Sequence, residues 1–365
     1  MDIRMESIVA ARTVFNGQEF DYFSGTGYLG LQSHPAVLQA AQEALLRYGL
    51  TTATSRGGYG EHPLYDELEH QACAYFDSQK MVYFASGYLG LAVLTQISGQ
   101  ANDHIFIDSA AHFSLWDAAH ATNRPITPFH HLSPDSLTEN LARELLSHER
   151  PVVLSDGVFP ISGEIAPLPD YLALLNSYGG LLLVDDAHAA GALGPHGRGT
   201  LDHFNIQADH CRASATLSKA LGGYGGVICG EADWIENIDR NGRVCVGASP
   251  PPLPVAAASA CALEIARTTP VLRQQLWDNV RQARRGLRDL GWELADTCVP
   301  ILCLGARPEI NLERLKNGLF DQGIAVSHVR SYTSTPPGGA LRIAIFATHT
   351  SQQIDHLVDG LRRLL

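Results

Sequence analysis

The chain has 365 residues, of which 45% are hydrophobic and 18% charged, and its formal net charge at pH 7 is −12. This composition is ordinary for a soluble globular protein, and the length fits one large domain plus a smaller one. The acidic excess argues against nonspecific binding to nucleic acids or anionic membranes, because such binding requires faces rich in Lys and Arg.

The seven cysteines are scattered, and they form neither a CxxC motif nor a zinc-like spacing with histidines. We therefore expect reduced, mostly buried thiols and no metal site. The N-terminus lacks the apolar segment of a secretory signal peptide. The longest apolar stretch, residues 253–266, is short and rich in alanine, so we interpret it as a buried helix and expect a cytoplasmic protein.

The first predicted helix covers residues 34–49, with Pro35 at a favourable first position and Gly49 suited to ending it. Its apolar side chains fall on one face: Val37, Leu38, Ala41, Leu45 and Tyr48. A second helix is predicted over residues 64–76. Residues 81–84 then form a short apolar run, and the small-residue turn Ser86-Gly87-Tyr88-Leu89-Gly90 opens another helix. Such a turn offers free backbone N–H groups to an anion, although many strand-to-helix turns bind none.

Short apolar segments that are typical of strands buried on both faces of a mainly parallel sheet recur along the first two thirds of the chain. They are residues 104–107, 151–155, 181–185 and 226–229. After about residue 240 the pattern changes to two long helical segments, three strands and a final helix from Ser351. They are residues 254–267, 270–290, 299–304, 324–329 and 340–346. No internal repeat is evident.

This alternation predicts an α/β fold. We expect an N-terminal segment, residues 1–40, that packs with the small domain. Residues 41–240 would form the large domain, and residues 241–365 a small α+β C-terminal domain.

Lys219 lies in Thr216-Leu217-Ser218-Lys219-Ala220-Leu221-Gly222-Gly223, and upstream the strand Leu181-Leu182-Leu183-Val184 ends in Asp185-Asp186-Ala187-His188. A lysine in a glycine-rich turn and an acid at a strand end are the groups that hold pyridoxal 5′-phosphate (PLP). The lysine forms the Schiff base, and Asp185 keeps the pyridine nitrogen protonated. The alternatives are a surface lysine, and an aspartate that caps a helix or forms a salt bridge.

Four more positions could complete the cofactor site. His112 follows a predicted strand and could stack on the pyridine ring, and His188 could reach the cofactor oxygen or the Schiff base; each could instead be a packed or surface histidine. Thr216 could hydrogen-bond the phosphate together with the N–H groups of Gly87 and Tyr88, or simply cap its own backbone. Arg342 lies in an apolar strand, where a substrate carboxylate and a structural salt bridge are equally good partners.

With these motifs the chain resembles the α-oxoamine synthase family of fold-type-I PLP enzymes over nearly its full length. The matching segments, in order, are Tyr28-Leu29-Gly30-Leu31, His34-Pro35, Ser55-Arg56, His62, Leu68-Glu69, Ser86-Gly87-Tyr88, His112, Asp156-Gly157-Val158-Phe159, Ile165-Ala166-Pro167-Leu168, Val184-Asp185-Asp186-Ala187-His188, Gly197-Arg198-Gly199, Thr216-Leu217-Ser218-Lys219, Leu341-Arg342-Ile343 and His349-Thr350.

The resemblance implies an aspartate aminotransferase-like fold with a mainly parallel seven-stranded sheet. It implies that Lys219 is the Schiff-base lysine and proton shuttle, and that Asp185, His188 and His112 contact the cofactor ring. It also implies phosphate contacts from Ser86, Gly87, Tyr88 and Thr216, and an Arg342 that grips the amino-acid carboxylate. Ser249 falls where the family often places a phosphate-binding hydroxyl from the neighbouring subunit, so a homodimer with interfacial sites is expected.

Two residues depart from the family pattern on the substrate side. Gly27 replaces an asparagine that helps to bind the substrate, and Pro160 replaces a common serine after Asp156-Gly157-Val158-Phe159. The segment before Tyr28 is also shorter than is usual in the family, where it helps to cover the acyl-thioester site.

The leading functional hypothesis is decarboxylative condensation of an α-amino acid with an acyl thioester such as an acyl-CoA. The departures from the family keep a second hypothesis open: a PLP reaction without CoA, namely aminotransfer, aldol-type addition, or side-chain elimination or replacement. A non-catalytic scaffold protein with this fold is a third.

Overall fold

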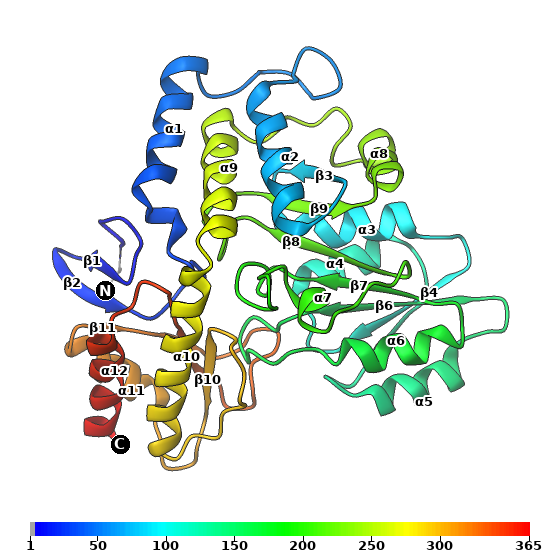
Figure 1. Ribbon diagram of the computed structural model, residues 1–365. Coiled ribbons are helices and arrows are strands. Elements are labelled where there is room, and N and C mark those ends of the chain that lie inside the picture. The colour runs from blue at the N-terminus through cyan, green and yellow to red at the C-terminus, as the bar shows by residue number, and fades with distance from the viewer. Residues whose placement is uncertain (1–3) are drawn as a thin grey trace.

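The computed structural model describes residues 4–365 and is built around one large sheet, to the right in Figure 1. Its seven strands run in the order β3-β9-β8-β7-β6-β4-β5. They are β3 (Lys80–Phe84), β4 (Asp103–Asp108), β5 (Ile126–Phe129), β6 (Arg150–Asp156), β7 (Leu181–Asp185), β8 (Cys211–Thr216) and β9 (Gly226–Gly230). Only β9 runs against its neighbours, so the predicted mainly parallel seven-stranded sheet is confirmed.

The central strands are buried on both faces, as their continuous apolar runs predict. In β6, Val152 and Leu154 pack into one hydrophobic cluster, and Val153 packs into another on the opposite face. Helices cover the two faces: α3 (Gly90–Ser98), α4 (Phe113–Ala121) and α8 (Ala232–Asn241) on one, and α5 (Pro134–Glu144) and α6 (Leu168–Asn176) on the other. The single turn α7 (Thr200–His203) follows the loop after β7.

Strands β5 and β8 were not recognised as apolar runs in the sequence. Strand β5 is an edge strand of the sheet and contains Pro128. An edge strand tolerates proline because no neighbouring strand on its open side needs the missing N–H group. Strand β8, Cys-Arg-Ala-Ser-Ala-Thr, consists mostly of small and polar residues, because glycines and turns pack closely against it. Neither strand therefore has the hydrophobic signal of a buried strand.

The C-terminal part and the N-terminal hairpin lie together on the left of Figure 1. One three-stranded sheet has the order β10-β13-β12, and the other has the order β1-β2-β11. The strands are β1 (Arg12–Phe15), β2 (Gln18–Tyr22), β10 (Ile301–Gly305), β11 (Ile324–Ala325), β12 (Ser327–Val329) and β13 (Ala340–Ala344). The parallel pairing of β2 with β11 joins the N-terminal segment to the C-terminal part. The domain boundaries given above stay a prediction.

The remaining helices occur where the sequence predicts them, except α11, because no helix is predicted over residues 312–321. They are α1 (Pro35–Tyr48), α2 (Pro63–Phe76), α9 (Leu253–Thr268), α10 (Val271–Asp289), α11 (Leu312–Asp321) and α12 (Ser351–Leu364). In the described part of the chain no single helix is long and apolar enough to cross a membrane. The pair α9 and α10, bent by 75°, passes by length and composition only, and α9 is packed against α1 and α2.

Two expectations about burial need correction. The apolar face of α1 is largely uncovered, since Leu38 and Leu45 are exposed and only Val37 and Ala44 in this helix are buried. The helix packs on α9 with Val37 and Ala44 buried, which leaves Leu38 and Leu45 uncovered in the single chain. Of the seven free cysteines only Cys211 is fully buried, and four of the others, Cys73, Cys229, Cys245 and Cys261, pack against the margins of the hydrophobic clusters.

Candidate active site

The carboxyl ends of the parallel strands bring most of the predicted site residues to one edge of the large sheet. Asp185 ends β7, Thr216 ends β8, and His112 caps α4 after β4. Asp156 ends β6 and is in register with Asp185 on the neighbouring strand. Ligands of open α/β sheets bind at this edge, because the loops there diverge and leave a crevice.

Lys219 lies in the turn between β8 and β9. The turn is held by its own backbone, since the N–H of Gly222 donates to the carbonyl of Lys219 (3.0 Å) and the N–H of Gly223 donates to Leu217 (2.8 Å). Within residues 4–365 the Nζ atom of Lys219 has no hydrogen-bond or ion-pair partner. Burial lowers the Lys219 pKa, and the nearby carboxylates of Asp185 and Asp156 oppose that shift. The lysine is thus a partly buried amine without a protein partner, and not a surface lysine.

Asp185 is buried, and one of its oxygens accepts a hydrogen bond from the N–H of Ala187 (2.9 Å). Its other oxygen has no hydrogen-bond partner among the described residues, and the residue forms no salt bridge there. Burial raises the Asp185 pKa, whereas the charge of Lys219 lowers it. A cationic ring nitrogen beside the free oxygen would favour the ionised form in the same way.

A buried chain of hydrogen bonds connects His188 to Arg342 through Tyr28. The Tyr28 hydroxyl lies 2.8 Å from His188 Nδ1, and Arg342 Nη2 donates to the same hydroxyl at 3.2 Å. Burial, followed by the charges of Lys219 and Arg342, keeps the His188 pKa well below its usual value, so this imidazole is neutral. Tyr28 was not assigned a role from the sequence, although its motif, Tyr28-Leu29-Gly30-Leu31, was noted.

Arg342 does not form the structural salt bridge that was an equal alternative, at least within residues 4–365. Its Nε donates to the carbonyl of Pro160 (2.7 Å), and its Nη1 donates to the carbonyl of Gly25 (3.0 Å). With Tyr28 as the third acceptor, one N–H on each terminal nitrogen is left without a protein partner. The guanidinium is therefore held in place by neutral acceptors, and no carboxylate of the described residues forms an ion pair with it. An anionic ligand could take that place.

His112 is oriented by its own helix terminus. Its backbone N–H donates to Asp156 (2.8 Å), and its Nδ1 accepts from the N–H of Ser114 (3.2 Å) and lies 2.8 Å from the Ser114 hydroxyl. Burial is the main cause that lowers the His112 pKa, which favours the neutral ring. Its Nε2 lies 2.9 Å from the hydroxyl of Tyr332, a residue of the C-terminal part that the sequence did not single out.

The turn after β3 lies directly against the end of β8. A Cβ at Gly87 would lie 2.7 Å from the Thr216 Cβ, so only glycine allows this approach. Ser86 caps the turn by accepting from the N–H of Tyr88 (3.3 Å). The Thr216 hydroxyl donates to the carbonyl of Gly225 (2.9 Å) and accepts from the N–H of Ser218 (3.2 Å), so it caps its own backbone, which was the alternative role. A phosphate contact from Thr216 would require its hydroxyl to rotate.

Ser249 is not brought to this cluster. It lies exposed in the loop between α8 and α9, and no hydrogen bond links its side chain to the cofactor-binding residues of the same chain within the described residues. Its expected phosphate contact is to the neighbouring subunit, so the single chain does not test it.

The space that a side chain at Gly27 would occupy is filled by the Gln32 carboxamide. A Cβ at Gly27 would lie 2.5 Å from Gln32 Nε2 and 2.6 Å from Gln32 Oε1. Nε2 donates to the carbonyl of Val9 (2.9 Å), whereas the buried Oε1 has no partner among the residues that the structure describes. An amide group is thus present beside position 27, but it comes from another residue.

We expect Gly27→Asn to destabilise the protein by about 1–3 kcal/mol, because the new side chain would overpack against the Gln32 carboxamide. The double variant Gly27→Asn, Gln32→Ala should regain most of that loss, since alanine vacates the space. Denaturant unfolding of the two variants checks this. A double variant no more stable than Gly27→Asn alone would contradict it, and Gln32→Ala alone serves as the control.

A charged cluster supports the same sheet edge beside the site. The His131 imidazole lies 2.8 Å from the buried carboxylate of Asp108 and 3.3 Å from Glu164. Burial alone would lower the His131 pKa, but the hydrogen bonds and charges of these two acids raise it to about 9. His131 is therefore an imidazolium at neutral pH and fixes the loop after β5 to the end of β4.

This raised pKa predicts a pH dependence of stability. The folded-state pKa is above the unfolded value, so the contribution is fully present below about pH 6.5 and is lost as the pH rises through about 9. Because Glu164 is half exposed, this contribution to the free energy of unfolding is on the order of 2 kcal/mol. Denaturant unfolding between pH 6 and 10 should show this loss in the wild type and a flatter profile in His131→Asn. Identical profiles would contradict the assignment.

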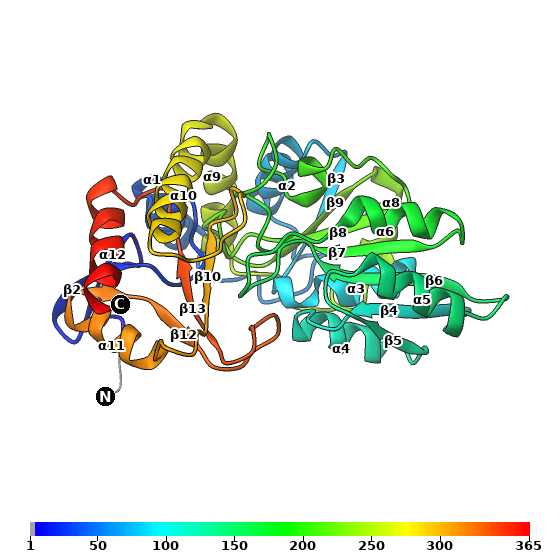
Figure 2. The ribbon, with the colours of Figure 1, turned by 90° about the horizontal axis from the view of Figure 1, so that it is seen from below.

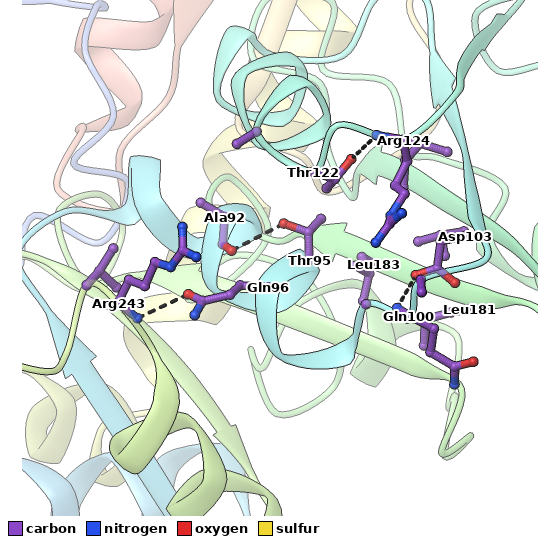
Figure 3. Close-up of a pocket in the computed structure, with 16 residues that line it drawn as sticks. Ala92, Thr95, Gln96, Gln100, Asp103, Thr122, Arg124, Leu181, Leu183 and Arg243 are labelled. Carbon is purple, nitrogen blue, oxygen red and sulfur yellow. Dashed lines mark hydrogen bonds between the residues drawn. The ribbon is translucent and has the colours of Figure 1, made fainter.

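The cavity drawn in Figure 3 is a different place. Its volume is about 460 Å³, and Thr95, Gln96, Asp103, Arg124 and Arg243 are among its lining residues. It lies toward the opposite edge of the sheet, where β4, β6 and β7 begin, and none of the predicted site residues lines it. The active-site assignment therefore rests on Lys219 and its surroundings.

The residues at the carboxyl edge fit PLP. Among residues 4–365, Lys219 offers an amine without a partner and Asp185 a free carboxylate oxygen, and Gly87 forms a turn that no larger residue could form. His112 is oriented at the same edge. Together with the seven-stranded sheet, this set of groups defines a fold-type-I PLP-dependent enzyme.

Comparison with known proteins gives the family. The model of the aminotransferase class I and II family matches residues 24–361. A putative 8-amino-7-oxononanoate synthase of Desulforudis audaxviator is 35% identical over 99% of this chain and 93% of its own length. A serine palmitoyltransferase of Sphingobacterium spiritivorum is 32% identical over 96% of this chain and 88% of its own length. The chain belongs to the aminotransferase class I and II family, and within it to the α-oxoamine synthases.

The fold agrees with a solved relative that carries the cofactor. Serine palmitoyltransferase from S. paucimobilis, solved as a variant with a bound PLP–myriocin aldimine, matches with a TM-score of 0.91 at 26% identity. The match covers 100% of this chain and 92% of that one. The expected fold and cofactor are thereby confirmed: the protein is a PLP-dependent enzyme of the acyltransferase type.

Proposed function

We propose that this protein condenses an α-amino acid with an acyl-CoA or another acyl thioester to give an α-aminoketone. In the net reaction the Cα–H and Cα–carboxylate bonds and the thioester C–S bond break, and a bond forms between Cα and the acyl carbon. The thiol and CO2 leave, and a proton returns to Cα. The observation that carries this proposal is that one site contains both groups the reaction needs. Among residues 4–365 the Lys219 amine has no partner, and the Arg342 guanidinium is held only by neutral acceptors.

Bound PLP supplies the electron sink that such a reaction needs at the substrate α-carbon. Lys219 would hold the cofactor through its amine and, once the substrate amine takes its place, would remove the α-proton. Its lowered pKa supports this, because burial favours the neutral amine, which is the form that can act as a base. Asp185 would keep the ring nitrogen protonated through its free oxygen.

Arg342 would bind the substrate carboxylate with its two unpartnered N–H groups. The carbonyls of Pro160 and Gly25 fix the guanidinium plane, so the loss of the usual serine hydroxyl at position 160 does not remove this support. The Tyr28 hydroxyl, which contacts both side chains, would hold Arg342 and His188 in a fixed relative orientation. His188 would contact the cofactor oxygen. His112 would stack on the cofactor ring.

The phosphate would be bound by the turn Ser86-Gly87-Tyr88 and by Thr216, with Ser249 of a second subunit completing the cradle. We therefore propose a homodimer with shared active sites. The exposed apolar residues of α1, together with Leu50, support this, because an uncovered face of this kind is costly in water. Analytical ultracentrifugation should show a dimer, and a monomer that retains full activity would contradict it. We expect the protein to act in the cytoplasm.

The experiment is a panel of amino acids tested against acyl-CoA esters of different chain length, with release of free thiol and CO2 as the two readouts. Equal amounts of both products support the decarboxylative condensation. Thiol release without CO2 indicates hydrolysis of the thioester. Conversion of the cofactor to its amine form by an amino acid alone would instead favour aminotransfer. No release with any pair would reject the proposal.

A further inference from the structure

The segment between β12 and β13 reaches from the small sheet to the large one. Figure 2 shows it as the orange loop that extends beyond β12 toward α4. Two side chains anchor it there. The buried Ser334 hydroxyl accepts from the N–H groups of Ile161 (3.3 Å) and Ser162 (3.4 Å), beside Pro160. Tyr332 reaches the helix terminus that carries His112.

Tyr332 contacts His112 through both its ring and its hydroxyl. The two rings lie 5.9 Å apart, and the Tyr332 ring also meets Phe113 edge to face at 5.2 Å. The hydroxyl lies 2.9 Å from His112 Nε2 and has no other hydrogen-bond partner among residues 4–365. These contacts fix one side of the imidazole, while Ser114 fixes the other.

The two contacts of the His112 ring determine which of its nitrogens carries the proton. Nδ1 accepts from the backbone N–H of Ser114, so in the neutral ring Nε2 carries the proton and donates it to the Tyr332 oxygen. The phenol then keeps its own O–H for another acceptor. Because the segment is docked beside Pro160 through Ser334 and on the helix terminus that carries His112, this O–H lies at the carboxyl edge of the sheet.

We propose that Tyr332 is a positioning residue that holds His112 in its Nε2–H form and offers a hydrogen-bond donor to the acyl oxygen of the second substrate. The hydrogen bond to the acyl oxygen rests on the proposed function. The orientation of His112 rests only on contacts within the chain. Through the segment between β12 and β13, the β10-β13-β12 sheet thereby supplies a residue, Tyr332, to the substrate side of the site.

The test is Tyr332→Phe, which removes only the oxygen and keeps the contact with Phe113. In the apo-protein labelled with ¹⁵N-histidine, two-bond ¹H–¹⁵N spectra should show the His112 signal shifting from the Nε2–H form toward a mixture of forms, with His112→Asn used to assign it. In the holoenzyme kcat should fall about 10-fold, the size expected for one hydrogen bond, with the Kd for PLP unchanged.

Tyr178→Phe is the matched control, because Tyr178 is an exposed tyrosine in the loop before β7. It should change neither the spectrum nor kcat. An unchanged His112 signal in Tyr332→Phe overturns the proposal whether or not the enzyme turns over, so it is distinguished from failure of the proposed function. A loss of PLP affinity with an unchanged His112 signal likewise overturns it, because the contact would then be only structural.

Discussion

Lys219→Ala is expected to abolish covalent attachment of PLP and to lower condensation activity by at least about 1,000-fold, because the variant loses both the attachment point and the base. The chain has only three lysines, at positions 80, 219 and 316. Lys80 is paired with Glu236 at 2.9 Å, so Lys219 is the lysine that is free to react within the site. Borohydride reduction followed by peptide mass spectrometry measures the attachment, and free-thiol release measures the activity.

The matched control is Lys316→Ala, which removes a lysine of α11 that contacts Asn317 and the Phe320 ring, neither of them a residue of the site. It should keep the reducible adduct and full activity. If Lys219→Ala still forms a borohydride-reducible adduct, the assignment of the lysine is wrong. Adding a small primary amine to Lys219→Ala should restore part of the activity if the residue acts as a base.

Asp185→Asn is expected to lower kcat by at least about 100-fold while the variant stays folded. Asparagine has nearly the same shape and can still accept from the N–H of Ala187, but it carries no charge to keep the ring nitrogen protonated. Because Asp185 is the first of the charges that raise the Lys219 pKa, that pKa should fall further in the variant. The pH dependence of Lys219 modification by an amine-selective reagent in the apo-protein measures this shift, and steady-state kinetics at saturating PLP measure kcat.

Asp170→Asn in the first turn of α6 is the control for a change of net charge, since Asp170 is exposed. It should leave kcat and the titration unchanged. A wild-type kcat in Asp185→Asn would show that the carboxylate has no part in the chemistry.

The candidate cofactor residues could be predicted from the sequence because each lies at a local landmark. Asp185 ends a continuous apolar strand, Lys219 lies in a glycine-rich turn, and Gly87 lies in a small-residue turn before a helix. In a parallel sheet, strand ends followed by loops meet at one edge, so local signals suffice to predict a shared site. The same reasoning located the long helices, because their apolar spacing depends only on the chain itself.

The contacts between distant segments could not be found in this way. Tyr332 meets His112, and Tyr28 joins His188 to Arg342, across separations of many residues that leave no local pattern. The exposure of the apolar face of α1 is also set by which side packs on α9. Sequence periodicity gives the face of a helix, but the partner of that face is a tertiary property.

By itself the sequence determined the class of fold and the cofactor, and it predicted the residues that would bind that cofactor, because these depend on short motifs in a fixed order. Only the tertiary structure decided how the substrate side is built. There, neutral acceptors hold Arg342, Gln32 fills the space beside Gly27, and Tyr332 fixes His112. The physical reason is that hydrogen bonds and packing between separate elements depend on the closed fold, and no spacing along the chain encodes them.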